Sequence, residues 1–165
     1  MSALEQALLT WVHLVSAAIW VGGSLFIGIV LSPLLKTMAD SAEDRMKIMI
    51  RVGRRFNLIA VPALAILVAT GLYNSHALLG RPELLAATSY GTYLAVKAAL
   101  VIALIATYAA HVRIISRSVE EKIISGAFTA EEVRRLRKKI IILGEVTVAI
   151  SITILFFAAL LDAGV

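Results

Sequence analysis

The chain lacks cysteine and is poor in charged residues, and each shortage excludes a class of protein. Without cysteine there is no disulfide-stapled secreted scaffold, no thiolate-held iron–sulfur cluster and no redox thiol. Charged residues make up 16% of the 165 residues, against about 25% in a typical soluble domain. Hydrophobic residues make up 60%, and the mean hydropathy is +0.91. This composition excludes a disordered chain and indicates an integral membrane protein.

Four stretches of the sequence are almost free of charge and long enough to cross a bilayer. Two of them hold no charged residue, the third holds only Lys97, and the fourth holds only Glu145. A spanning helix needs about 20 mainly apolar residues, and backbone groups cannot remain unpaired in hydrocarbon. We therefore predict an all-α fold: one integral membrane four-helix bundle, residues 1–165, with spans at about 8–33, 56–79, 90–112 and 140–161.

Basic residues predict the orientation of the bundle. Of the 16 Lys and Arg residues, six lie in residues 36–55 and eight lie in residues 113–139. The positive-inside rule places both of these connections in the cytoplasm and both termini outside. We expect a multi-pass protein of the cell membrane whose net charge of +5 attracts anionic inner-leaflet lipid. The charge gives no reason to expect nucleic acid as a partner.

Both basic connections carry helix signals. Thr129-Ala-Glu-Glu132 is a capping box, and Gly126 before it is suited to end a helix. We therefore expect the third and fourth helices to extend into the cytoplasm as a hairpin. Ser41 and Asp44 are placed to cap a helix that runs on into the second span.

Ionisable side chains inside the spans point to function, because each costs about 2.5–3.5 kcal/mol to insert. In antiparallel helices, His13, His76 and Lys97 all fall near the outer side and are expected to meet there. Trp20 shares the side of His13 on the first helix. On the third helix, Lys97 shares one polar face with His111 and with three tyrosines, Tyr90, Tyr93 and Tyr108.

A second pair of ionisable residues lies toward the inner side. His111 and Glu145 fall at similar depths on the third and fourth helices. A histidine beside a carboxylate lowers the burial cost of both groups. The pair is therefore either a structural contact or a second metal or proton site.

Haem b is the cofactor that this pattern favours first. Imidazole is a common axial ligand, and a four-helix bundle can hold a macrocycle between facing helices. In this interpretation His13 is the axial or metal ligand, His76 lies opposite, and Trp20 and Tyr93 help to line the site. Lys97 either contacts a propionate, acts as a catalytic proton-handling group, or extends its amine to the interface. The alternative for His13 is a packing residue bonded to a neighbouring helix.

The same residues resemble a known family. The copper-resistance protein D (CopD) family is similar in Trp11-Val-His13 and Trp20-Val-Gly22-Gly23, in Thr70-Gly71-Leu-Tyr-Asn, and in Tyr90-Gly91 followed by Lys97. This resemblance runs over about residues 11–113 and implies a membrane fold with a metal or haem connection. His13 and Lys97 also resemble the paired residues of HemJ-type protoporphyrinogen oxidases, a haem-b-binding membrane family.

Three functions remain open at this point, so whether the protein is an enzyme is open too. They are a haem-b redox or electron-transfer protein, a copper-resistance component that transports copper, and a HemJ-like porphyrinogen oxidase. Copper(I) prefers Cys and Met ligands, whereas Met38, Met46 and Met49 all lie in the first basic connection. The expected partners are the lipid bilayer, a redox partner or copper chaperone, and a second copy of the chain, because the core is small.

Overall fold

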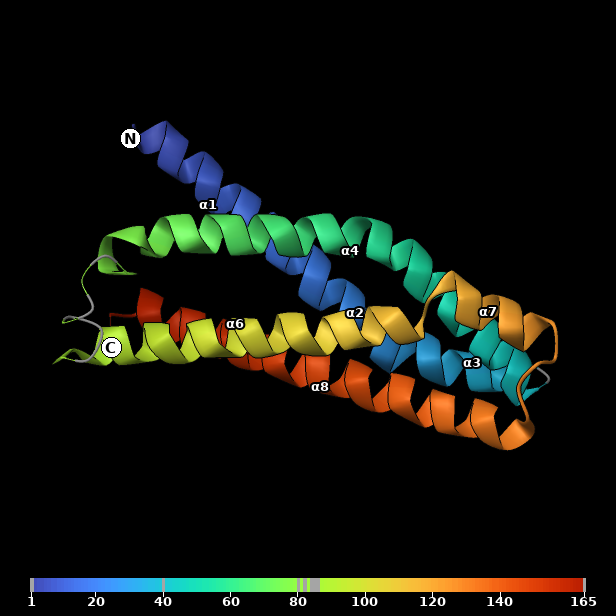
Figure 1. The fold of residues 1–165 in the computed structure, drawn as a ribbon. Coiled ribbons are helices and arrows are strands. Elements are labelled where there is room, and N and C mark those ends of the chain that lie inside the picture. Colours follow the sequence, from blue (N-terminus) through green and yellow to red (C-terminus); the bar gives the residue numbers. More distant parts are fainter. Residues whose placement is uncertain (1, 40, 80, 82, 84–86, 165) are drawn as a thin grey trace.

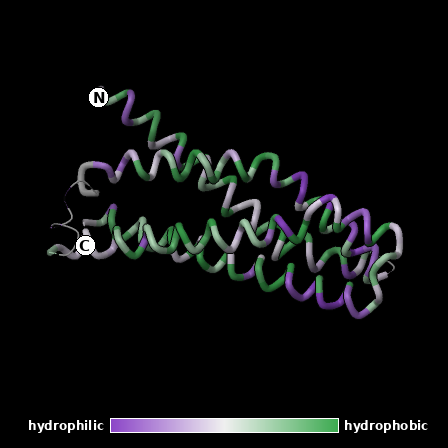
Figure 2. Tube along the Cα trace, viewed as in Figure 1, coloured by the Kyte–Doolittle hydropathy of each residue, from purple (hydrophilic) through white to green (hydrophobic). Residues whose placement is uncertain are grey.

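The computed structural model describes residues 2–39, 41–79, 81, 83 and 87–164. Within them, four helical segments are long and apolar enough to span a membrane, which confirms the predicted number of spans: Ala3–Met38, Ala42–His76, Ser89–Ile124 and Ala130–Asp162. Figure 1 shows an elongated bundle with the two ends of the chain at the same end of the molecule. In Figure 2, hydrophilic residues gather at the opposite end, around α7 and the start of α8.

The first segment is one continuous helical rod with two widened turns. It begins with α1 (Ala3–Ala17) and passes through a π-helical turn at Ala18–Gly22. After the short α2 (Gly23–Leu25), a second π-helical turn spans Phe26–Leu31, and α3 (Ser32–Met38) completes the rod. Such turns add a residue to the helix and are common at functional sites.

The second segment, α4 (Ala42–Leu79), is an unbroken helix that starts well before the apolar run. Its beginning matches the predicted cap, because the backbone N–H of Asp44 donates to Ser41 Oγ at 3.0 Å. The helix continues through Pro62. The connection that holds the first group of basic residues is therefore largely the first turns of this helix.

The third segment is divided in two. α6 (Ser89–Ile114) is followed by a short break and then by α7 (Arg117–Ile124), which packs against α4. The sequence analysis expected one continuous extension here, and the break at residues 115–116 corrects it. Gly126, with φ of +68°, occupies the left-handed conformation that ends a helix, as predicted.

The fourth segment, α8 (Ala130–Asp162), opens with the predicted capping box. The backbone N–H of Glu132 donates to Thr129 Oγ1, and the backbone N–H of Thr129 donates to Glu132 Oε2 at 2.8 Å. α8 lies along α6 over much of its length. At the α3–α7 end, a buried cluster closes the bundle: Met46, Ile50, Ile115, Ile123 and Ile140.

Candidate functional site

His13 on α1 is held by a hydrogen bond to α4. Its Nδ1 lies 2.6 Å from Thr70 Oγ1. The Thr70 hydroxyl in turn lies 2.6 Å from the carbonyl oxygen of Ile66, and since a carbonyl cannot donate, the hydroxyl hydrogen belongs to that bond. Nδ1–H of His13 is therefore the donor to Thr70, and Nε2 carries the free lone pair. In this tautomer the ring could bind a metal through Nε2 while Thr70 holds the other nitrogen.

Gly71 lies beside this histidine. A Cβ at Gly71 would lie 3.8 Å from His13 Cε1, an ordinary van der Waals distance, so the imidazole ring lies next to α4 without requiring a glycine there. Thr70 is buried, with 7% of its surface exposed, and His13 is half-buried. The paired Thr70-Gly71 thus gives His13 one hydrogen-bond acceptor and one flat surface.

Lys97 on α6 acts on the same site through its charge. Its ammonium group is close enough to His13 to interact electrostatically with the ring. The side chain is half-buried, and among the described residues it makes no ion pair with a carboxylate. The charge of Lys97 therefore reaches His13, but no contact joins the two side chains among the described residues, and their shared site stays a prediction.

Trp20 lies deeper, at the centre of a packed layer across the bundle. It is 2% exposed, and its Nε1–H donates to Ser151 Oγ of α8 at 2.9 Å. Its ring meets the edge of Tyr108, with centroids 4.7 Å apart, and the Tyr108 hydroxyl donates to Asn57 Oδ1 at 2.7 Å. This group, with Ala60 and Leu104, is called the Trp20 layer below. It joins all four segments.

The structure does not bring His76 and Tyr93 to His13 through any contact between described residues. The exposed His76 places Nδ1 2.5 Å from the carbonyl oxygen of Tyr73 on its own helix. It follows Thr70 by six residues, which rotates it about 120° around α4. Tyr93 faces α8, with its ring centroid 6.0 Å from that of Phe157. Their roles as ligand and lining residue stay predictions.

A cavity of about 520 Å³ lies on the other side of the Trp20 layer, next to Tyr108. His111, Glu145 and Met49 all line it, and a Cβ at Gly144 would lie 3.6 Å from His111 Cε1. No hydrogen bond or ion pair joins His111 to Glu145 within the described chain, and Glu145 is exposed. The two predicted residues therefore share a cavity without a direct bond.

Met49 also lines this cavity, which its place in the sequence did not predict. Its basic surroundings assigned it to a connection outside the spans. Because α4 runs unbroken through this region, Met49 reaches the same cavity as His111. The only sequence signal was the capped start of α4 at Ser41.

No closed metal centre is present in the part of the chain that the structure describes. There, no three His, Cys, Asp or Glu side chains gather closely enough to hold a metal ion. What the bundle offers instead is single candidate side chains on either side of the Trp20 layer: His13 with its Nε2 on one side, and His111 with the thioether of Met49 on the other.

Comparison with known proteins identifies one matching family. The model described as "Copper resistance protein D" matches residues 50–161. The match includes Thr70, Gly71 and Lys97 but leaves His13 and Trp20 outside it. An uncharacterized protein of Aquifex aeolicus (strain VF5) is 37% identical over 82 residues, covering 48% of this chain and 55% of that protein. The chain thus spans about half the length of this curated relative. No solved structure matches.

Proposed function

The chain belongs to the copper resistance protein D family, and from this membership we propose that it handles copper ions in the membrane as cargo. The four apolar helices make it a multi-pass membrane protein. The family match supports copper, whereas haem b, the first expectation from the sequence, gains no support from it. The likeness to HemJ-type oxidases is likewise unsupported by the family match.

The observation that carries the proposal is the hydrogen bond between His13 and Thr70. With Nδ1–H committed to Thr70 Oγ1 at 2.6 Å, the imidazole presents Nε2 as a lone-pair donor, and imidazole nitrogen is a good copper ligand. A second partner that fixes the ring in this way usually accompanies a metal-binding histidine. A histidine held only for packing would make the same hydrogen bond, so the copper titration below decides between the two roles.

Lys97 adjusts how tightly the ion is held. An ammonium group near His13 repels a bound copper cation, and this repulsion is strong where water is scarce. Binding at His13 is therefore weak enough to reverse. The cavity with His111 and the soft thioether of Met49 is the second station, that is, the second binding site for the ion, because thioethers favour copper(I). The Trp20 layer lies between the two stations.

The test is a copper(I) titration of the purified full chain in detergent, against a coloured chelator that competes for the ion. His13→Ala should lower the copper bound per chain, since it removes the ligand with the free Nε2. His76→Ala is the comparison. Because His76 is exposed and bonded to its own helix, this variant should bind as the wild type does, and a loss of copper there would instead show that His76 is the opposing ligand. Equal binding by wild type and His13→Ala would overturn the proposal.

Haem b remains the second candidate, since the same free Nε2 suits an axial ligand. Lys97→Met should have opposite effects on copper binding and on haem retention. It should strengthen copper binding at His13 by removing a repelling charge, but it should weaken haem retention if Lys97 contacts a propionate. An absorption spectrum of the purified protein completes the test: a Soret band that disappears in His13→Ala would replace copper with haem.

A further inference from the structure

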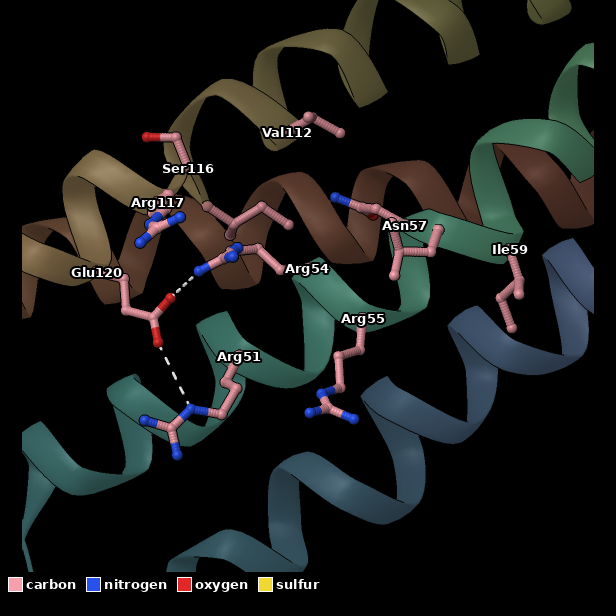
Figure 3. Close-up of a pocket in the computed structure, with 11 residues that line it drawn as sticks. Arg51, Arg54, Arg55, Asn57, Ile59, Val112, Ser116, Arg117 and Glu120 are labelled. Atoms are coloured by element: carbon pink, nitrogen blue, oxygen red, sulfur yellow. Dashed lines mark hydrogen bonds and ion pairs between the residues drawn. The ribbon is translucent and has the colours of Figure 1, made fainter.

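A groove of about 850 Å³ opens at the basic end of the bundle, where α4 passes the junction of α6 and α7. Figure 3 shows its lining. Four arginines contribute to it and only one carboxylate does: Arg51, Arg54, Arg55 and Arg117 with Glu120. The groove is distinct from the His13 site and lies next to the cavity that contains His111, with which it shares Asn57 and Ile115. Its lining has an excess of positive charge.

Glu120 positions two of these arginines without using up their donors. Its side chain is only 9% exposed, and its Oε1 lies 3.5 Å from Arg51 Nε. Its Oε2 accepts from Arg54 Nη1, as the dashed lines in Figure 3 indicate. A guanidinium group carries several further N–H donors in a fixed plane, so both arginines can bind another acceptor. Arg55 makes no ion pair with any described residue.

The groove also has an apolar part, and this part indicates its depth in the membrane. Leu58 and Ile59, which follow Arg55 on α4, line it and are 76% and 57% exposed. Exposed apolar side chains at the start of a charge-free span face the acyl chains of a bilayer. The three arginines of α4 lie one to two turns earlier on the same helix, at the level where lipid headgroups begin.

We propose that this groove binds the phosphate group of an anionic phospholipid, with an acyl chain lying along Leu58 and Ile59. Arginine recognises phosphate through paired N–H donors. Basic pockets between membrane helices are suited to anionic headgroups. A soluble phosphate shares the headgroup's chemistry but makes no use of the apolar part of the groove. This proposal does not depend on copper.

The test is native mass spectrometry of the full chain in detergent, titrated with phosphatidylglycerol or with neutral phosphatidylcholine. Wild type should retain phosphatidylglycerol in preference. The double variant Arg51→Gln/Arg55→Gln should weaken this binding about tenfold to thirtyfold. The matched control is Arg134→Gln/Lys138→Gln, which removes two exposed positive charges at the same spacing on α8. It should change binding less than about twofold.

Three outcomes decide the proposal. The proposal is wrong if both double variants lose phosphatidylglycerol binding to the same extent. It is also wrong if wild type retains phosphatidylglycerol and phosphatidylcholine equally. If inorganic phosphate binds wild type as tightly as phosphatidylglycerol does, the source of the phosphate is soluble and the lipid assignment is wrong. If the double variant does not fold, Arg55→Gln alone still decides, because Arg55 has no ion pair to lose, and it should weaken binding about fivefold.

Discussion

Thr70→Val is the sharpest test of the His13 site. Valine keeps the shape of threonine but removes the oxygen that accepts the Nδ1–H hydrogen bond of His13, 2.6 Å away. The helical backbone at Ile66 keeps its own hydrogen bonds, so α4 should remain intact. His13 then loses both the partner that fixes its orientation and the preference for the tautomer with a free Nε2. Copper binding at this histidine should weaken.

The expected size follows from that lost bond. Removing the second partner of a metal-binding histidine typically costs about tenfold to a hundredfold in affinity, which is about 1.4–2.7 kcal/mol. The measurement is the copper(I) competition titration. It is made in a His111→Ala background, so that only the site at His13 is read. A melting curve in detergent checks that the fold is retained.

The matched control is Thr153→Val. The Thr153 hydroxyl donates to the carbonyl oxygen of Ala149 at 2.9 Å, the same kind of bond that Thr70 makes to Ile66, but Thr153 is exposed on α8. Loss of the Thr153 hydroxyl should leave the affinity for copper within about twofold of that of the parent protein. If Thr70→Val binds copper as tightly as Thr153→Val, while His13→Ala does not bind, then His13 is a ligand but the argument from its tautomer is wrong.

Two further predictions concern packing, each read from melting temperatures in detergent. Gly23→Ala should destabilise the bundle by about 1–3 kcal/mol, because its Cβ would lie 2.6 Å from Phe56 Cζ. The control is Gly22→Ala, which should have little effect because nothing lies within 4 Å of a Cβ there. Equal effects of the two substitutions would contradict the close approach of α2 and α4. Trp20→Phe should cost about 1–3 kcal/mol through a lost hydrogen bond and a cavity. Trp11→Phe, at a position 61% exposed, is its control, and a similar loss there would show that the layer contributes nothing special.

The spans could be predicted because hydrocarbon imposes a strong local rule on sequence. A run of about 20 residues without charge has few alternatives to a membrane helix, and the caps at Ser41 and Thr129 add local hydrogen bonds that sequence spacing reveals. The break between α6 and α7 has a weaker signal, since neither glycine nor proline marks it and only Ser116, the N-cap of α7, with Glu120 in the first turn, indicates a new helix. The π-helical turns could not be predicted either. Each adds a residue and shifts the direction of the side chains that follow, but a uniformly apolar helix has no polar face in which such a shift would be visible.

The depth of the candidate site residues in the membrane could be predicted, but the direction in which each helix faces its neighbours could not. Counting residues along antiparallel helices placed His13 and Lys97 at one level, and the charge of Lys97 does reach His13, although no contact joins them in the described part of the chain. Which faces of the helices meet depends on packing across the whole bundle, so the partner of His13 proved to be Thr70. His76 has a suitable depth but lies on an exposed face. The sequence pattern could not distinguish these two residues of α4.

The Trp20 layer also has a consequence for movement along the bundle. Indole, phenol and aliphatic side chains pack together in its middle, and the polar atoms there are already paired, Trp20 with Ser151 and Tyr108 with Asn57. Passage from the side of His13 to the side of His111 would therefore require these side chains to move and their hydrogen bonds to break.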